Sequence, residues 1–500
     1  MDYTWHVPVG AANPSTKRNG TSHSSDHIYM SLLNSPDIER GSYEEEVHAV
    51  IIGAAAAGLA AAASIRAAGL RCINLERNAT PGDRWRKRYA RLHLHDVAEF
   101  CQLPYWGMPD FFPRYVPSAD YANYLDAYAL ACGADVRGGM DVTGVARANE
   151  REVERGFRWR VLASDTSGRA AAFLCKHVVF ADGLYNRPRL PDGVLSSSDA
   201  FHGDVIHSSE YVDSRPFAGK RVVVCGFGNS GMEIALDLAE VAEEVVALVR
   251  DPASRGTVPL GPYGDWQRLP RYLELPRHAA TELARTGWLG GLLAAVPSIL
   301  ADIIDKLKDA WLARRAFQEW ERMGAPRGDL RPFGLATLPG DGSCGYIEHI
   351  HKSSKVATMD VGAVKHVIAG NIRIENAALS GLTPKGAVVR AQGHAATVLP
   401  CDAIICCTGY HTLEQFRTLL PPDARQALHG GIDGFLVEPA LRGSAIMSGD
   451  PTAVEGVWFV YGRLAQIEES ARRLGANIVA AEARLERKRA RGPVQQNLEA

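Results

Sequence analysis

Two stretches of the chain share one pattern of apolar and polar positions. They read "HAVIIGAAAAGLAAAASIRAAGLRCINLER" at residues 48–77 and "KRVVVCGFGNSGMEIALDLAEVAEEVVALVR" at residues 220–250. In each, an unbroken apolar run is followed by glycines, a helical segment (56–68 in the first copy) and a second apolar run. Unbroken apolar runs are typical of parallel strands covered on both faces. Each stretch therefore predicts a strand, a tight turn, a helix and another strand.

Other segments predict further strands and one long helix. "FRWRVLAS" at 157–164 and "CKHVVFADG" at 175–183 read as strands, and 372–393 reads as a hairpin with a glycine turn. "CDAIICCTGY" at 401–410 is another buried strand, and a helix is expected at about 467–490. We predict an α/β fold with two dinucleotide-binding, Rossmann-like domains, of which one is split in sequence and the other is inserted in it.

The expected domain bounds follow from this organisation. They are a flexible N-terminal arm at 1–45, the split dinucleotide-binding domain at 46–212 and 359–485, the inserted dinucleotide-binding domain with an irregular substrate-side insertion at 213–358, and a charged tail at 486–500. A partner-docking segment is the alternative for the arm.

The glycine turns are the first candidate chemistry. A G-x-G-x-x-G turn lets the chain turn tightly, brings backbone close to a pyrophosphate and packs the helix on the strand. Gly226, Gly228 and Gly231 meet this pattern in full, at residues 226–231. The first turn has Gly53 and Gly58 at the outer positions and Ala55 in the middle. Alanine adds a methyl group where the ligand approaches and disfavours a positive φ, so we expect one weakened contact.

The residue after each second strand indicates which nucleotide binds. Glu76 follows Gly53 by 23 positions, near the ~20 expected for a ribose-binding carboxylate. Arg250 stands at the matching place in the second copy, where a guanidinium suits a 2′-phosphate. The first site is therefore expected to bind FAD and the second NADPH, so that an NADPH-binding domain at 213–358 is inserted in a split FAD-binding domain at 46–212 and 359–485. The alternatives are a plain alanine-rich βαβ unit and a solvated surface arginine.

Composition narrows the class of protein. The formal net charge of the 500 residues is −2, so no nucleic-acid partner is expected. Nine cysteines are scattered without a CxxC or a paired Cys/His spacing. This argues against a metal site and a disulfide scaffold, and favours a reducing, cytoplasmic location. It also argues against a disulfide reductase, which needs a redox-active thiol pair.

The most apolar run is "WLGGLLAAVPSILADII" at residues 288–304. It contains Pro297 and is short for a bilayer span. We expect a buried or site-capping helical hairpin, with a membrane-surface patch as the less favoured alternative. No signal peptide is visible in the polar first 45 residues.

Together these motifs resemble the flavin-containing monooxygenases, which are class B flavoprotein monooxygenases, and within them the YUCCA-like branch. "FHGDVIHSSEY" looks like the family fingerprint F-x-G-x-x-x-H-x-x-x-[YFW], carried by Phe201, Gly203, His207 and Tyr211. "GDRWRKRYARLHLHDVAEFCQLP" at 82–104 is similar to the flavin-side segment of that branch. "MDVGAVKHVIAGNIRI" at 359–374 looks like its return into the FAD domain, and "CCTGY" at 406–410 stands where the family has A-T-G-Y.

The resemblance implies an NADPH- and FAD-dependent monooxygenase that oxygenates a small organic substrate with O2 through a C4a-(hydro)peroxyflavin. Oxidative decarboxylation of a 2-oxo acid such as indole-3-pyruvate is the first expectation, beside N- or S-oxygenation. A Baeyer–Villiger monooxygenase, an NADPH oxidase and a non-catalytic nucleotide-binding flavoprotein are the alternatives. The fingerprint ends in Tyr211 rather than Trp, which leans against the Baeyer–Villiger reaction. The oligomeric state is not predicted.

The resemblance also implies roles for single residues. His95 and Asp96 are the candidate catalytic pair near the isoalloxazine ring, with a structural His–Asp pair as the alternative. Trp85 is expected against the flavin, or else as a core aromatic, and His207 is expected to support the link between the domains. The remaining candidate cofactor contacts are Ala57, Arg77, Val142, Asn229, Ser230, Thr408, Gly409 and Tyr410.

Some of these candidates carry a stated alternative or a departure from the family. Asn229 and Ser230 either bond to the nucleotide or cap the helix. Thr408, Gly409 and Tyr410 are expected to form the interdomain linker. Asp182 replaces the usual threonine of A-T-G, and its carboxylate repels anionic nucleotides unless it is paired. Tyr263, Trp266 and Tyr346 are expected to face the substrate or else to pack in the core.

Overall fold

The computed structural model describes residues 43–197, 200–251, 257–259, 295–336, 358–411, 418–428 and 448–490. Most of the predicted N-terminal arm, and Tyr263, Trp266 and Tyr346, lie outside these residues.

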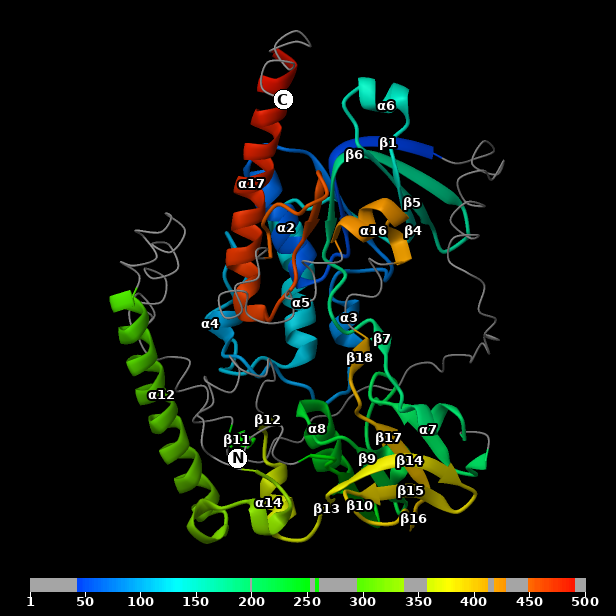
Figure 1. The fold of residues 1–500 in the computed structure, drawn as a ribbon, viewed down its shortest axis with the longest axis vertical. Helices are drawn as coiled ribbons and strands as arrows, with labels where there is room; N and C mark the ends of the chain where they lie inside the picture. The colour runs from blue at the N-terminus through cyan, green and yellow to red at the C-terminus, as the bar shows by residue number, and fades with distance from the viewer. Residues whose placement is uncertain are drawn as a thin grey trace.

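A seven-stranded sheet, which we call the first sheet, forms one half of the molecule (Figure 1). Its order is β3-β2-β1-β6-β5-β4, and β19 also pairs with β6. Pairing is parallel among β3, β2, β1, β6 and β19, and antiparallel from β6 to β5 and from β5 to β4. The strands are β1 (Tyr43–Ile52), β2 (Cys72–Glu76), β3 (Val136–Gly138), β4 (Asp141–Arg147), β5 (Trp159–Ser164), β6 (Ala170–Phe180) and β19 (Val457–Phe459).

The alanines of α2 let a second helix approach it closely. Ala60, Ala61 and Ala62 are fully buried, and Gly475 of α17 lies against the backbone of Ser64. Both helices pack with the first sheet in one core cluster. The helices of this half are α2 (Ala56–Ala67), α3 (Asp83–Arg86), α4 (Ala98–Cys101), α5 (Ser118–Ala131), α6 (Glu150–Glu154), α16 (Pro422–Leu428) and α17 (Leu464–Ala490).

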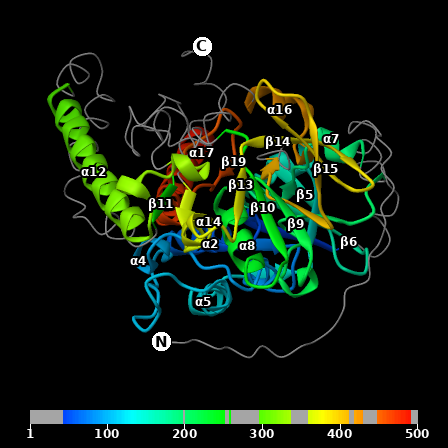
Figure 2. The same cartoon turned by 90° about the horizontal axis from the view of Figure 1, so that it is seen from below.

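A five-stranded parallel sheet, the second sheet, forms the other half, seen from below in Figure 2. Its order is β13-β10-β9-β17-β8, and an antiparallel meander, β14-β15-β16, packs beside it. The strands are β8 (Asp204–His207), β9 (Arg221–Cys225), β10 (Glu244–Leu248), β13 (Arg373–Glu375), β14 (Ala377–Thr383), β15 (Gly386–Ala391), β16 (Thr397–Pro400) and β17 (Ala403–Cys406), with the separate pair β11 (Thr257–Pro259) and β12 (Thr358–Asp360). The helices are α7 (Asp192–Leu195), α8 (Asn229–Leu238), α12 (Ala295–Arg322) and α14 (Ala363–Ile368), and short 3₁₀ turns cover Arg215–Phe217, Pro326–Gly328 and Arg331–Phe333.

Three strands pair in a different sheet from the one that the predicted domain bounds imply. β8 was expected with the first part of the FAD domain, and β13 and β17 with its second part, yet all three pair in the second sheet. The segment 359–374 is therefore no direct return to the first sheet. The reason is that buried parallel strands share the same apolar pattern, so the sequence does not show which sheet a strand joins. Only the strand that it pairs with does. The exact domain bounds remain a prediction.

Two short strands carry the chain between the two sheets. β7 (Arg187–Pro188) leads away from the first sheet, β18 (Tyr410–His411) leads back, and they pair antiparallel. They lie between the two halves in Figure 1. The second sheet is thus an insertion whose entry and exit run side by side.

The region expected to be irregular contains the long helix α12. Pro297 is its third residue, where the missing N–H costs no helical hydrogen bond. Its later turns anchor in the core through Leu312, Ala316 and Trp320, which are nearly or fully buried.

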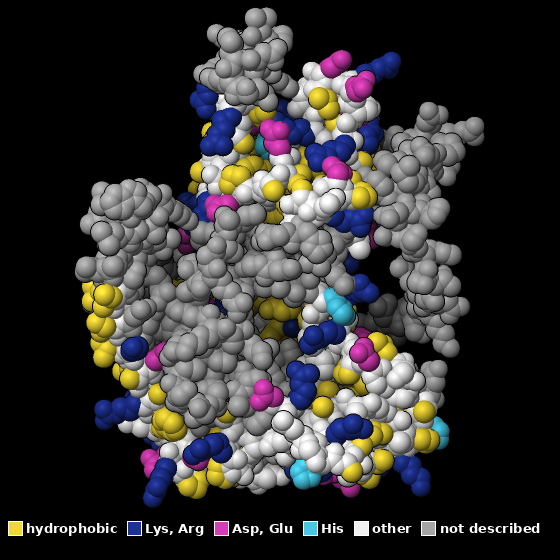
Figure 3. All heavy atoms as spheres, in the orientation of Figure 1, with side chains coloured by type: hydrophobic (Ala, Val, Ile, Leu, Met, Phe, Trp, Pro, Cys, Tyr) yellow, Lys and Arg dark blue, Asp and Glu magenta, His cyan; other side chains and the backbone are white. Residues whose placement is uncertain are grey.

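The earlier turns of α12 present apolar side chains at the surface. Ile299, Leu300, Ile303 and Leu307 are exposed by 47–65%, and they form a hydrophobic edge at the side of the molecule (Figure 3). The expected buried or site-capping hairpin is therefore wrong for these residues. In the described part of the chain, no helix is both long enough and apolar enough to span a bilayer.

Candidate dinucleotide-binding site

The first glycine turn joins β1 to α2. Gly53 has φ +100°, and a Cβ there would lie 2.7 Å from the carbonyl oxygen of Ala181. A Cβ on Gly58 would overlap the carbonyl of Gly53. The two outer glycines therefore make the turn and pack the helix on the strand, as predicted. The first turn of α2 carries no acidic residue, so its unpaired N–H groups are open to a phosphate.

Ala55 does not carry the backbone strain expected from the sequence. It is the N-cap of α2 with φ −75° and ψ −166°. Gly228 caps α8 with nearly the same angles, φ −81° and ψ −170°. The middle position of the turn is extended backbone that any residue adopts, so only the added methyl group distinguishes Ala55 from glycine.

Glu76 is held at the end of β2 by the turn itself. Its Oε2 accepts a hydrogen bond from the Ala54 amide at 2.9 Å, and its Oε1 accepts two from Asn78, at 2.8 and 2.7 Å. Glu76 is 7% exposed. A carboxylate has about four acceptor positions, so one remains for a ribose hydroxyl.

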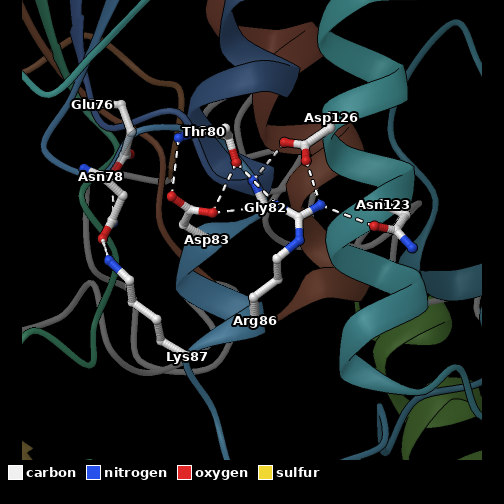
Figure 4. A network of polar contacts seen from close by, with 9 residues as sticks. All are labelled: Glu76, Asn78, Thr80, Gly82, Asp83, Arg86, Lys87, Asn123 and Asp126. Carbon is white, nitrogen blue, oxygen red and sulfur yellow. Dashed lines mark hydrogen bonds and ion pairs between the residues drawn. The ribbon is translucent and has the colours of Figure 1, made fainter. Parts of the chain in front are cut away.

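A polar network continues from this carboxylate to α3 and α5 (Figure 4). Lys87 donates to Asn78 at 2.6 Å, while Arg86 donates to Asp83, Asn123 and Asp126. The Gly82 amide also donates to Asp126 at 2.9 Å. The network fixes α3 beside the end of β2, and α3 carries Trp85.

Trp85 and the remaining first-site candidates surround this point. The ring of Trp85 meets Tyr121 edge-on at 4.9 Å and packs against the core clusters of both halves. Val142 is buried in β4, two residues after Met140, whose amide donates to the Glu76 carbonyl. Ala57 is half-buried in the first turn of α2, and Arg77 is exposed just after β2. Their contacts with the cofactor remain predictions.

The second glycine turn repeats the geometry of the first. Gly226 has φ +97°, and a Cβ there would lie 2.7 Å from the carbonyl oxygen of Cys407. A Cβ on Gly231 would overlap the carbonyl of Gly226. α8 likewise has no acidic residue in its first turn. Both turns thus fit the phosphates of a dinucleotide.

The polar candidates of the second turn divide into two groups. The side chain of Asn229 accepts the Met359 amide at 2.8 Å and so ties α8 to β12. No side chain caps α8. Ser230 makes a side-chain hydrogen bond with Tyr89, and its contact with the nucleotide remains a prediction. Arg250 is exposed two residues after β10, the position expected for binding a 2′-phosphate.

The predicted linker residues lie at the crossing between the sheets. Arg189 and Thr408 exchange hydrogen bonds, and His207 bonds through Nε2 to the Gly409 carbonyl at 3.0 Å. Tyr410 lies edge-on to the His207 ring, 5.0 Å between centroids. The fingerprint histidine therefore supports the link, as expected for it.

His95 and Asp96 do not form a mutual pair in the described contacts. His95 Nε2 lies 2.5 Å from Glu233 Oε1, and Glu233 belongs to α8 on the other side of the crossing. The Asp96 carbonyl accepts a hydrogen bond from Cys101. Glu233 was not among the predicted site residues. Its signal in the sequence is an acid that recurs four positions later as Asp237, within a mostly apolar stretch of α8.

Asp182 is paired with two neutral side chains, beside the first glycine turn. Its carboxylate accepts hydrogen bonds from the Tyr461 hydroxyl and from Asn186. Burial raises the pKa of Asp182, against the opposing effect of these bonds. A raised pKa weakens its negative charge beside the first turn.

The cysteines of the described residues are all free. Cys406 ends β17 and Cys407 follows it, and burial raises the pKa of Cys406 to about 12. A thiol that is hard to ionise is a poor redox nucleophile, so this site does not support the disulfide-reductase alternative.

Comparison with known proteins agrees with this geometry. The model of the flavin-binding monooxygenase-like family matches residues 46–254, which hold both glycine turns. Indole-3-pyruvate monooxygenase YUCCA1 of Oryza sativa subsp. japonica is 30% identical over 365 residues, 73% of this chain and 77% of that protein. The chain belongs to the flavin-binding monooxygenase-like family. It is a class B flavin-dependent monooxygenase with a YUCCA-like sequence, as predicted.

Solved structures support the fold of this monooxygenase. A flavin-containing monooxygenase from Stenotrophomonas maltophilia superposes with a TM-score of 0.53 at 21% identity, over 87% of this chain and 99% of that one. OTEMO in complex with FAD and NADP superposes with a TM-score of 0.58 at 18% identity, over 88% and 86%. The predicted pair of Rossmann-like folds is confirmed. FAD and NADPH, the cofactors predicted for this monooxygenase, agree with its family.

Proposed function

We propose that this monooxygenase oxidatively decarboxylates a 2-oxo acid at the expense of NADPH and O2. The balanced reaction gives the shortened carboxylic acid, CO2, water and NADP⁺. The supporting observation is the pair of matched glycine turns on two sheets joined by one double crossing. When bound, FAD accepts the hydride of NADPH and activates O2, and the chain supplies position and a dry site.

The residues of the first turn would hold FAD. Glu76 would accept a ribose hydroxyl, the N-terminal amides of α2 would bind the diphosphate, and Trp85 would lie against the flavin. Gly53 and Gly58 would give the backbone its close approach.

The residues of the second turn would hold NADPH. Gly226, Gly228 and Gly231 would cradle its diphosphate, Ser230 would donate a hydrogen bond, and Arg250 would bind the 2′-phosphate.

The substrate class draws support from the relatives and from local charge. The curated relatives that match are named indole-3-pyruvate monooxygenases. Arg84, Arg77 and Arg88 lie near enough to one another that the two neighbours lower the pKa of Arg84, after the larger effect of burial. Within the described residues, no carboxylate forms a salt bridge with Arg84. Arg84 is half-buried and donates to the Tyr185 carbonyl, and a cation of this kind suits an anionic ligand such as a carboxylate.

The experiment has two stages. The purified protein is mixed anaerobically with NADPH, then with O2, in a stopped-flow spectrometer, and flavin absorbance is followed. It is next incubated with indole-3-pyruvate, and indole-3-acetate and CO2 are measured against NADPH consumed. Bleaching by NADPH and a product-to-NADPH ratio near one are expected.

Other results identify the alternatives. Conversion of a cyclic ketone to a lactone would indicate a Baeyer–Villiger enzyme, and an oxygenated amine or sulfide would indicate N- or S-oxygenation. NADPH consumption with hydrogen peroxide as the product would indicate an oxidase. Nucleotide binding without flavin reduction would indicate a non-catalytic flavoprotein.

A further inference from the structure

One face of α8 carries a row of carboxylates. Glu233 and Asp237 are four residues apart in α8 and so lie on the same side of the helix, and Glu240 stands in the turn that follows it. The partners of these carboxylates come from outside α8. This face is therefore a contact surface rather than a solvated one.

The partners come from the flavin-side segment and from the fingerprint. Arg91 donates to Asp237 at 3.4 Å and to Glu240 at 2.6 Å. The hydroxyl of Tyr211 donates to the other oxygen of Asp237 at 2.6 Å. His95 meets Glu233, which is the first of the three carboxylates after the glycine turn. We call these six residues the α8 seam.

The segment before His95 belongs to both halves of the molecule. Leu92 is buried in the core cluster around α8, and Leu94 is buried in the cluster around α2. Trp85 packs against both clusters. A displacement of this segment against α8 would therefore move the two nucleotide sites relative to each other.

Burying the carboxylate of Glu233 costs folding free energy, which a purely structural role does not explain. It is 2% exposed, its Oε1 meets His95, and its Oε2 has no hydrogen-bond partner of good geometry in the described part of the chain. A buried carboxylate whose oxygens are not fully satisfied is no more stabilising than a neutral residue of the same shape. Tyr89 lies beside it, and the pKa of the Tyr89 hydroxyl is raised by burial, then by the charge of Glu233 and by a hydrogen bond to it. A buried polar group that is not fully hydrogen-bonded calls for an explanation, such as a role in the reaction.

We propose that Glu233 is a positioning residue for hydride transfer from NADPH to the flavin, acting through His95. This rests on the proposed function, in which α8 begins at the NADPH site and the segment before His95 leads to the flavin site. Glu233 holds His95 at the end of the seam nearest the second glycine turn. Transfer between two bound cofactors depends steeply on their separation, and a misplacement of about 1 Å costs on the order of 100-fold in rate.

The test compares Glu233→Gln with Glu243→Gln, an exposed control that removes the same charge after α8. FAD content is read from visible absorbance, NADP⁺ affinity from the flavin difference spectrum, and the bleaching rate from anaerobic stopped-flow at saturating NADPH. The control should match the unmodified protein. Glu233→Gln should keep its FAD, bind NADP⁺ within about 3-fold and bleach about 10- to 100-fold more slowly. Bleaching within about 2-fold of the unmodified rate would overturn the proposal.

A second variant guards against misfolding. His95→Asn breaks the same contact from the other side, and the double variant should bleach no more slowly than the slower single variant, because the pair acts as a unit. If neither single variant folds with FAD, Glu233 is a structural residue and the proposal fails.

A last readout separates this failure from that of the proposed function. If dithionite bleaches the unmodified protein but NADPH does not, the proposed function fails. Hydride transfer then does not occur, and the role proposed for Glu233 fails with it. If NADPH bleaches the unmodified protein and Glu233→Gln at the same rate, the proposed function stands and the positioning role alone fails.

Discussion

Ala55 and Gly53 show how two neighbouring positions of one turn make different demands. Gly53 needs a positive φ and has no room for a Cβ, while Ala55 lies in extended backbone. The motif treats both as glycine positions, but only one of them requires glycine for its conformation. A glycine at the middle position serves only to let the ligand come close to the backbone.

We therefore predict opposite results for two substitutions. Ala55→Gly should leave the stability of the fold nearly unchanged and tighten FAD binding by a few-fold, since it removes one methyl group from the phosphate approach. Gly53→Ala should destabilise the protein by about 1–3 kcal/mol and lose FAD. Flavin fluorescence during titration of the apoprotein and thermal unfolding measure the two effects. Equal FAD affinity for Ala55→Gly and the unmodified protein would show that the methyl group does not touch the ligand.

Asp182 gives a second prediction at this scale. Its pKa is raised, so the carboxyl loses its proton as pH rises through that value, and its charge then opposes the bound phosphates. Asp182→Asn should bind FAD more tightly than the unmodified protein at pH 8, and this advantage should shrink at pH 5. The exposed Asp192→Asn is the control, and FAD affinity at each pH is the measurement. Weaker binding by Asp182→Asn at both pH values would mean that Asp182 supports the site through its hydrogen bond with Tyr461.

Among the elements, α17 is attached to the first sheet through a buried histidine. The Trp458 indole donates to His177 Nδ1 at 3.0 Å, and Nε2 lies 3.0 Å from Glu482 Oε1 on α17. Nδ1 is thus occupied as an acceptor, and burial lowers the pKa of His177. The neutral imidazole is the form that the fold holds.

This attachment predicts a loss of stability on mild acidification. The unfolded chain binds a proton at His177 near pH 6.5, while the folded protein does so only at lower pH. The free energy of unfolding therefore falls as pH drops below 6.5. His177→Gln should cost about 1–2 kcal/mol at pH 7.5 and flatten this dependence down to pH 5.5. Thermal midpoints across this range measure it, with exposed His394→Gln as the control; an unchanged pH dependence would contradict the role of His177.

Elements of the fold were predictable wherever apolar periodicity decides them. The strands β1, β2, β9, β10 and β17, the helices α2 and α8 and the β14–β15 hairpin all lie where the patterns indicated. Sheet membership was not predictable, because buried parallel strands look alike in sequence. The turns of the site were predictable from glycine spacing. The Glu233–His95 contact was not, since it joins residues 138 positions apart across two halves.

At the scale of the whole molecule, the start of α12 extends away from both sheets (Figures 1 and 2). Its apolar residues at 299, 300, 303 and 307 are exposed, and its anchor lies further along the helix. The helix is therefore held at one end only by the described residues.

We predict that this exposed edge contributes little to folding. Ile303→Ser and Leu307→Ser should each change the free energy of unfolding by less than about 0.5 kcal/mol, as is usual for surface positions. Trp320→Ala, in the anchored part, should cost about 3–5 kcal/mol. Chemical denaturation with fluorescence detection compares them. A cost above about 2 kcal/mol for Ile303→Ser would show that another part of the chain covers this edge.

The paired crossing at β7 and β18 also sets the order in which the protein is completed during synthesis. β6 ends at Phe180, but its parallel partner β19 starts only at Val457. At 5–20 residues per second, a ribosome needs roughly 15–55 s to make the intervening chain. During that time the strands from β8 to β17 leave the ribosome and can pair among themselves, while the end of β6, Val178–Phe180, waits for β19. Newly made chains thus pass through a stage in which the nicotinamide half is finished and the flavin half is still open, and a supply of FAD in the cell matters most at the end of translation.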